Sequence, residues 1–352
     1  MSLATFAAWL DRVDPGVHRR IKGLRLVTAY GIAALLGALH DVSRGLTDGA
    51  ALSLLAGGFA LWASVSEARE TRAQSSRDLA IFTACATLGA TVTACLTPWL
   101  AAGGRAVPEL TLVLGAFAVG YARRFGPTGA GIGSQFFIGQ LLAYGAGLTA
   151  HDWPLIVAAG LISTVAAVIP RLLSGPAERP VVAPPTAPPL ARWRLPAEFV
   201  MGLQAALAAL LIVALNAAFT LTQSAWAMAA CTYVVTNTAA GTIDRIRRRI
   251  IGTAIGLPLG LACLPIAEHA PIVIWAAAAL AMVVYAMALP ERYDIACGAY
   301  TFTLIVTLAA SGQHALPVLA ARFWETVIGG ALGLAAATLV FPLKDPPASP
   351  LS

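Results

Sequence analysis

The chain has 352 residues, of which 58% are hydrophobic and only 11% are charged. Soluble proteins carry about 25% charged residues, so a soluble globular fold of this length is excluded. Long uncharged stretches, such as 199–243 and 270–290, alternate with short charged segments, which is typical of a helical protein that crosses a membrane repeatedly. The net charge of +6 therefore indicates basic cytoplasmic loops, and no nucleic-acid partner is expected.

Division of the sequence at its charged clusters predicts twelve membrane spans. They lie near 21–40, 47–65, 79–99, 107–122, 129–149, 153–173, 198–219, 222–239, 250–267, 270–289, 295–312 and 316–342. A helix needs about 20 residues to cross the ~30 Å core of a bilayer, and several of these segments are at the short end. The expected fold class is all-α, a polytopic membrane protein with about 12 transmembrane helices.

The basic residues predict the orientation of these spans. With a cytoplasmic N-terminus, 20 of the 23 Arg and Lys residues fall on the inner side, whereas only Arg44 and Arg105 fall on the outer side. This asymmetry follows the positive-inside rule at every predicted loop, so both termini are expected in the cytoplasm. No cleavable signal peptide is visible at the N-terminus, and the abundance of Arg over Lys is typical of a protein from a GC-rich bacterial genome.

A proline-rich segment divides the chain into two halves. Residues 174–196 contain seven prolines and no apolar periodicity, which predicts a stiff, extended cytoplasmic linker. The predicted organisation is a six-helix repeat at 1–173, the linker, a second six-helix repeat at 197–343 and a short tail at 344–352.

An internal repeat is suggested by matching residues at a constant offset. Residues 127–154 and 290–317 share prolines at both ends and a His-x-x-Pro motif at an offset of 163. An even number of spans in each half makes the repeat parallel, with a pseudo-two-fold axis along the membrane normal. In transporters built this way, the substrate pathway usually lies between the halves.

Two motifs in the second half point to a family. Arg-x-x-Gly-Thr-x-x-Gly begins at Arg249, and Arg-x-x-Glu-Thr-x-x-Gly-Gly begins at Arg322, with a charged turn at Pro290–Tyr293 between them. In this order, over about residues 198–343, the motifs resemble the fusaric-acid-resistance family of aromatic-acid exporters. The first half resembles it only through the internal repeat, and has Ala159 and Ile162 where the second half has Arg322 and Glu325.

The resemblance implies an inner-membrane permease that exports aromatic carboxylates or related toxic compounds without a cofactor. The expected partners are the lipid bilayer and a small organic anion, with a periplasmic adaptor protein as a further candidate. Two alternatives stay open: a passive anion channel, and a non-transporting scaffold of an envelope complex. An enzyme is not expected, because the spans contain no catalytic acid pair, nucleophile motif or metal-ligand cluster.

Arg322 and Glu325 are the main site candidates, because they form the acid–base pair well inside a predicted span. Their spacing of three places them on one helix face, and charges at membrane depth usually face a partner or a wet cavity. They would either neutralise each other and fix helix packing, or hold a substrate carboxylate on the guanidinium.

The other candidates for the substrate pathway are the cytoplasmic Arg247, Arg248 and Arg249, together with Tyr300 and Asn237. The arginines would gather anions at the inner entrance, and Tyr300 could stack on an aromatic substrate. Most remaining intramembrane amides, among them Gln135, are expected to make hydrogen bonds between helices, and the glycines spaced by four are expected to allow close helix packing.

Overall fold

A computed structural model describes residues 12, 14, 17–39, 49–69, 71–174, 195–221, 224–236, 238–289, 291–310 and 316–343. Within these ranges the chain forms helices and contains no strand. The first half has six main helices: α2 (His18–Ala38), α4 (Gly49–Ser66), α5 (Arg72–Ala101), α6 (Leu110–Tyr121), α7 (Gly126–Gly145) and α8 (Trp153–Leu173). Short 3-10 turns η1 (Val107–Glu109), η2 (Ala122–Phe125) and η3 (Ala150–Asp152) connect them.

The second half begins after the linker, most of which lies outside the described residues. Its helices are α9 (Ala197–Phe219), α10 (Ser224–Val234), α11 (Ala239–Ala262), α12 (Leu264–His269), α13 (Pro271–Ala288), α14 (Tyr293–Ala310) and α15 (Leu316–Leu339). Each predicted span overlaps one of these helices or one in the first half. The number of helices that cross the bilayer stays a prediction.

Two differences from the expected boundaries matter for the site. Helix α10 has only 11 residues, about 16 Å at 1.5 Å per residue, which is too short to cross a bilayer core by itself. Helix α11 begins at Ala239, where the side chain of Thr238 accepts a hydrogen bond from the backbone N–H of Gly241. The arginine-rich segment 241–249, expected between two spans, is therefore the first part of a helix.

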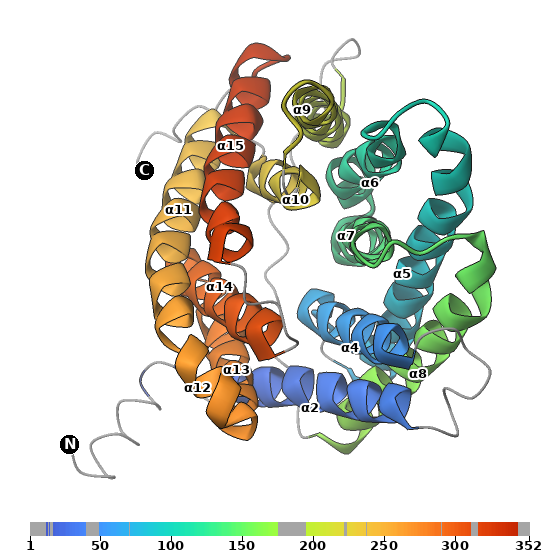
Figure 1. Cartoon of the computed structure of the whole chain (residues 1–352), viewed down its shortest axis with the longest axis vertical. Coiled ribbons are helices and arrows are strands. Elements are labelled where there is room, and N and C mark those ends of the chain that lie inside the picture. The colour runs from blue at the N-terminus through green and yellow to red at the C-terminus, as the bar shows by residue number, and fades with distance from the viewer. Residues whose placement is uncertain are drawn as a thin grey trace, which may run out of the picture.

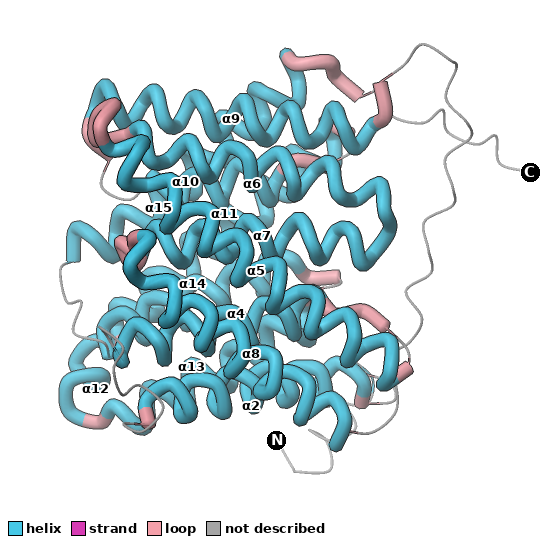
Figure 2. The backbone as a smooth tube through the Cα atoms, turned by 90° about the vertical axis from the view of Figure 1, so that its right-hand side faces the viewer, coloured by secondary structure: helices cyan, strands magenta, loops and turns pink. Residues whose placement is uncertain are grey.

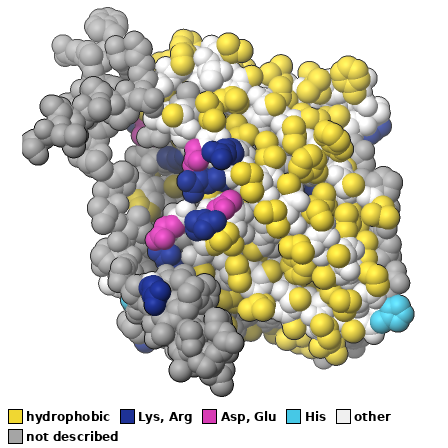
Figure 3. Space-filling model, turned by 90° about the vertical axis from the view of Figure 1, so that its left-hand side faces the viewer, with side chains coloured by type: hydrophobic (Ala, Val, Ile, Leu, Met, Phe, Trp, Pro, Cys, Tyr) yellow, Lys and Arg dark blue, Asp and Glu magenta, His cyan; other side chains and the backbone are white. Residues whose placement is uncertain are grey.

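The apolar helices point to a membrane protein. Among the described residues, five helical segments are long and apolar enough to cross a membrane: His18–Ala38, Arg72–Ala101, Ala150–Leu173, Ala197–Phe219 and Pro271–Ala288. Figure 2 shows that the helix axes run in one general direction. The face on which α11 lies is covered mostly by hydrophobic side chains, with charged side chains gathered toward one edge (Figure 3), as a lipid-facing surface requires.

Six helix contacts of the first half recur between the corresponding helices of the second half. In the first half α2 contacts α4 and α8, α4 contacts α8, α5 contacts α7 and α8, and α6 contacts α7. In the second half the helices at the corresponding positions make the same pairs: α9 with α10 and α15, α10 with α15, α11 with α14 and α15, and α13 with α14. The halves meet along two seams, α6 against α9 and α2 against α13, and these seams close a ring of helices (Figure 1).

Glycines let several of these helices approach closely. A Cβ placed on Gly256 of α11 would lie 2.2 Å from the carbonyl oxygen of Gly298 in α14, and one on Gly329 of α15 would lie 2.3 Å from the carbonyl oxygen of Ala227 in α10. Real Cβ atoms do not come this close, so the backbones could not pack this way with any larger residue. The prediction that these glycines report close helix packing is confirmed.

Buried glutamine side chains connect neighbouring segments of the bundle. Gln135 of α7 donates to the carbonyl oxygen of Trp62 in α4 (2.8 Å), Gln140 donates to that of Thr111 in α6 (2.9 Å), and Gln204 donates to that of Val340 (2.8 Å). The expectation that such amides make hydrogen bonds between helices is confirmed for Gln135 and Gln140, whereas Gln204 bonds to the residue that follows α15.

Candidate functional site

Two adjoining cavities lie between the halves. The larger has a volume of about 680 Å³ and is lined by α2, α4 and α7 of the first half and by α9, α10, α13, α14 and α15 of the second. The smaller, of about 300 Å³, lies among α4, α7, α10, α11, α13, α14 and α15. The wall shared by the two cavities consists of Trp62, Leu141, Leu142, Trp226, Tyr300, Leu304 and Arg322.

Arg322 is the charged member of this shared wall. It lies on α15 with 6% of its surface exposed, and its guanidinium carbon is 4.0 Å from the ring centroid of Trp226. Its nearest ion-pair partner, Glu325, is 3.8 Å away, which is beyond hydrogen-bonding distance. Among the described residues, Nε and Nη1 of Arg322 and both carboxylate oxygens of Glu325 have no hydrogen-bond partner. The two side chains therefore lie near each other, as expected, and two nitrogens of Arg322 remain able to donate hydrogen bonds to a ligand.

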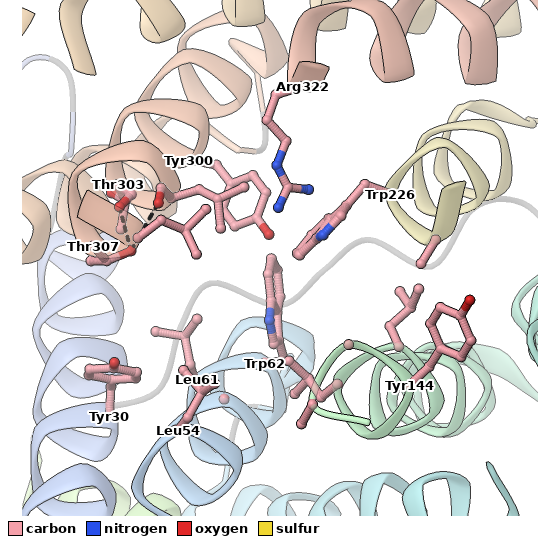
Figure 4. A pocket seen from close by; sticks show the side chains of 18 of the residues that line it. Tyr30, Leu54, Leu61, Trp62, Tyr144, Trp226, Tyr300, Thr303, Thr307 and Arg322 are labelled. Carbon is pink, nitrogen blue, oxygen red and sulfur yellow. Dashed lines mark hydrogen bonds between the residues drawn. The ribbon is translucent and has the colours of Figure 1, made fainter. Parts of the chain in front are cut away.

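Aromatic rings surround this guanidinium. Trp62 projects from α4 toward Tyr300 of α14, with ring centroids 5.3 Å apart in an edge-to-face arrangement. Figure 4 shows Arg322, Trp226, Tyr300 and Trp62 converging from four helices on the space between the two halves. Such rings offer an apolar surface to a planar ligand, and the guanidinium beside them offers hydrogen-bond donors with the geometry that suits a carboxylate.

The smaller cavity carries a concentration of positive charge. Arg123 of η2 and Arg245 and Arg249 of α11 line it, and none of the three forms an ion pair with a described residue. Arg249 donates a hydrogen bond to the hydroxyl of Tyr293 (3.3 Å). The guanidinium carbon of Arg245 lies over the same ring, 5.4 Å from its centroid. Burial, and then the charge of Arg245, lower the pKa of Arg123. Repulsion between neighbouring guanidinium groups would be relieved by a bound anion.

The larger cavity also contains a carboxylate, at the end away from the smaller cavity. Glu109 of η1 has no exposed surface and accepts hydrogen bonds at Oε1 from Tyr144 of α7, Asn216 of α9 and Ser224 of α10. Arg105, which is exposed, lines the same end of the cavity. Under the predicted orientation, this end faces the periplasm and the arginines of the smaller cavity face the cytoplasm.

The remaining predicted site residues lie elsewhere. Arg247 is exposed on α11 and lines neither cavity. Arg248 is paired with Asp244, one turn earlier, at 2.8 Å. Asn237 lies outside the described residues. Because α11 is helical here, residues four apart share a face, so Arg249 is accompanied in the cavity wall by Arg245 and not by Arg247 or Arg248.

Trp62, Trp226 and Glu109 were not among the predicted site residues. The sequence contains a signal for the tryptophans, since Trp62-Ala63 and Trp226-Ala227 match at an offset of 164, the offset that also relates Tyr121-Ala122 to Tyr285-Ala286. Glu109 could not be singled out, because the helices that supply its hydrogen-bond donors are far away in the sequence. Within the described ranges, no three His, Cys, Asp or Glu side chains form a possible metal site.

The comparisons with known proteins support the resemblance inferred from the motifs. Residues 206–336, a little over a third of the chain, match the family described as fusaric acid resistance protein-like. The motifs that begin at Arg249 and Arg322 both fall inside this range, so the resemblance is confirmed there. Neither the curated proteins nor the solved structures gave a match. The family and the apolar helices together point to a membrane transport protein.

Proposed function

We propose that this chain, fusaric acid resistance protein-like over residues 206–336, is a permease that exports aromatic carboxylates. The observation that carries the proposal is the buried guanidinium of Arg322 in the wall shared by both cavities. A substrate carboxylate would accept hydrogen bonds from the donors of Arg322 that no described residue uses. Its ring would lie against Trp62, Trp226 and Tyr300.

The charge distribution supports a direction of movement. An anion in the cytoplasm would meet Arg123, Arg245 and Arg249 first, since positive charge in a cleft raises the local concentration of anions. From there it would pass to Arg322 and then to the larger cavity. An inside-negative potential contributes about 2.3 kcal/mol per charge per 100 mV to outward movement of an anion, so no ATP-binding site is needed.

The proposed setting is the bacterial inner membrane, with both termini cytoplasmic and twelve spans in two parallel repeats. The matching helix contacts in the two halves support the repeat, as do the paired seams α6–α9 and α2–α13. A pathway between such halves agrees with the position of both cavities.

The test measures uptake of radiolabelled benzoate into proteoliposomes that contain the purified protein, with an imposed membrane potential. We expect saturable uptake that fusaric acid and 4-hydroxybenzoate inhibit, and that acetate and neutral benzyl alcohol do not. A passive channel would instead give unitary anion currents in planar bilayers without saturation at comparable concentrations.

The Arg322→Gln variant assigns this activity to the site. A charge-assisted hydrogen bond contributes about 1.5–3 kcal/mol, so we expect benzoate uptake to fall by about 10- to 100-fold. Arg248→Gln is the matched control, because Arg248 lines neither cavity. An Arg322→Gln protein that is equally abundant and transports benzoate at the normal rate would refute the assignment.

A further inference from the structure

Glu109 differs from the other buried carboxylates in how its two oxygens are used. Oε1 accepts hydrogen bonds from Tyr144 (2.9 Å), Asn216 (2.6 Å) and Ser224. Oε2 is buried and has no hydrogen-bond partner among the described residues. Glu109 forms no ion pair with the part of the chain that the structure describes, although Arg105 lies at the same end of the cavity.

The contrast with Glu67 shows what a buried structural carboxylate looks like in this chain. One oxygen of Glu67 accepts from the hydroxyl of Ser75 (2.6 Å) and the backbone N–H of Arg69 (2.9 Å), and the other faces Arg25 at 3.6 Å. Both oxygens thus have partners and the negative charge is balanced. The unpartnered Oε2 of Glu109 instead suits a carboxyl group that carries a proton, because burial disfavours an unbalanced charge.

The groups around Glu109 come from both halves. Tyr144 of α7 and Arg105 of the segment between α5 and η1 are the titratable or charged groups that face it. Helices α9 and α10 of the second half present only the neutral Asn216 and Ser224. Hydrogen bonds to an ionised carboxylate are about twice as strong as those to a neutral acceptor. The charge of Glu109 therefore affects how firmly η1 is held to α9 and α10.

We propose that Glu109 is a proton-binding site in the wall of the larger cavity, and that its protonation loosens the contact between the halves at this end. A proton from the aqueous cavity binds to Oε2, and the carboxylate becomes neutral. Asn216 and Ser224 then donate to a weaker acceptor, so α9 and α10 are released from η1 more easily. The consequence for transport rests on the proposed function, whereas proton binding itself does not.

Infrared difference spectroscopy of the reconstituted protein tests proton binding without any transported substrate. We expect a protonated-carboxyl band that disappears as the pH is raised, is lost in Glu109→Gln, and is retained in Glu198→Gln. Glu198 is a matched control because it lines neither cavity. In Ser224→Ala one donor to the ionised form is removed, so the midpoint of the band should move upward by about one pH unit.

Benzoate flux at a fixed membrane potential then tests whether protonation of Glu109 affects transport. We expect the wild-type rate to change with pH at the same midpoint as the carboxyl band, and the rate of Glu109→Gln to be independent of pH. A wild-type carboxyl band that does not titrate, or that Glu109→Gln leaves unchanged, would overturn the proposal. Absence of benzoate flux in the wild type, together with a titrating band at Glu109, would overturn the proposed substrate and leave the proton site standing.

Discussion

At the scale of single residues, the site combines a cation with an aromatic surface inside an apolar bundle. The guanidinium of Arg322 lies 4.0 Å from the ring centroid of Trp226, close enough for a cation–π interaction. This contact holds the guanidinium in place while leaving its Nε and Nη1 without a hydrogen-bond partner among the described residues. Trp226 is thus expected to position Arg322 as well as to contact the substrate ring.

Substitution of Trp226 should separate these contributions. We expect Trp226→Leu to raise the KM for benzoate by about 2- to 30-fold, because a cation–π contact contributes roughly 0.5–2 kcal/mol. Trp226→Phe should retain much of the affinity, since a ring face remains. Trp99→Leu is the control, because Trp99 is 82% exposed on the outside of α5. Equal KM values for Trp226→Leu and the wild type would contradict the proposed role.

At the scale of helices, the arginines of α11 are sorted by helical periodicity. Arg245 and Arg249 are four residues apart and line the smaller cavity, whereas Arg247 is on an exposed face. We expect Arg245→Gln and Arg249→Gln to slow benzoate uptake at low substrate concentration, and the loss to shrink at high salt, where the field of the charges is screened. Uptake by Arg247→Gln should match the wild type. An equal effect of all three substitutions would indicate a general surface-charge effect.

The packing of α11 on α14 depends on glycine at the contact. A methyl group on Gly256 would meet the carbonyl oxygen of Gly298 at 2.2 Å. We expect Gly256→Ala to destabilise the protein by about 1–3 kcal/mol or more through overpacking, which lowers the thermal unfolding temperature in detergent. Gly31→Ala is the control, because nothing lies within 4 Å of a Cβ at that position of α2. A normal unfolding temperature for Gly256→Ala would mean that α11 and α14 pack less closely than described.

At the scale of the whole molecule, orientation decides which cavity faces which side of the membrane. Arg105 lies at one end of the larger cavity, and Arg124, which follows the cavity-lining Arg123 in the sequence, is exposed. A membrane-impermeant maleimide, applied to cells, should label the Arg105→Cys variant more strongly than the wild type. It should label the Arg124→Cys variant above the wild-type level only when it is applied to inverted membrane vesicles.

Reporter fusions after Ser352 and within the 174–196 linker should both read cytoplasmic. A periplasmic signal from either fusion would overturn the predicted topology.

The sequence by itself determined the class of the protein, because that class depends on composition and on order along the chain. Apolar stretches separated by charged clusters predicted the helical segments, and two motifs predicted the family likeness that residues 206–336 confirm. The pairing of Arg322 with Glu325 was also predictable, because residues three apart on one helix are always neighbours.

Only the tertiary structure decided which of these residues meet across the halves. Trp62, Arg245 and Arg322 come from three different helices and line one cavity, and the donors to Glu109 come from α7, α9 and α10. The sequence spacing of such residues has no fixed relation to their distance, because helix packing sets that distance. Even within one helix, the start of α11 at Ala239 decided that Arg245, and not Arg247, shares the cavity with Arg249.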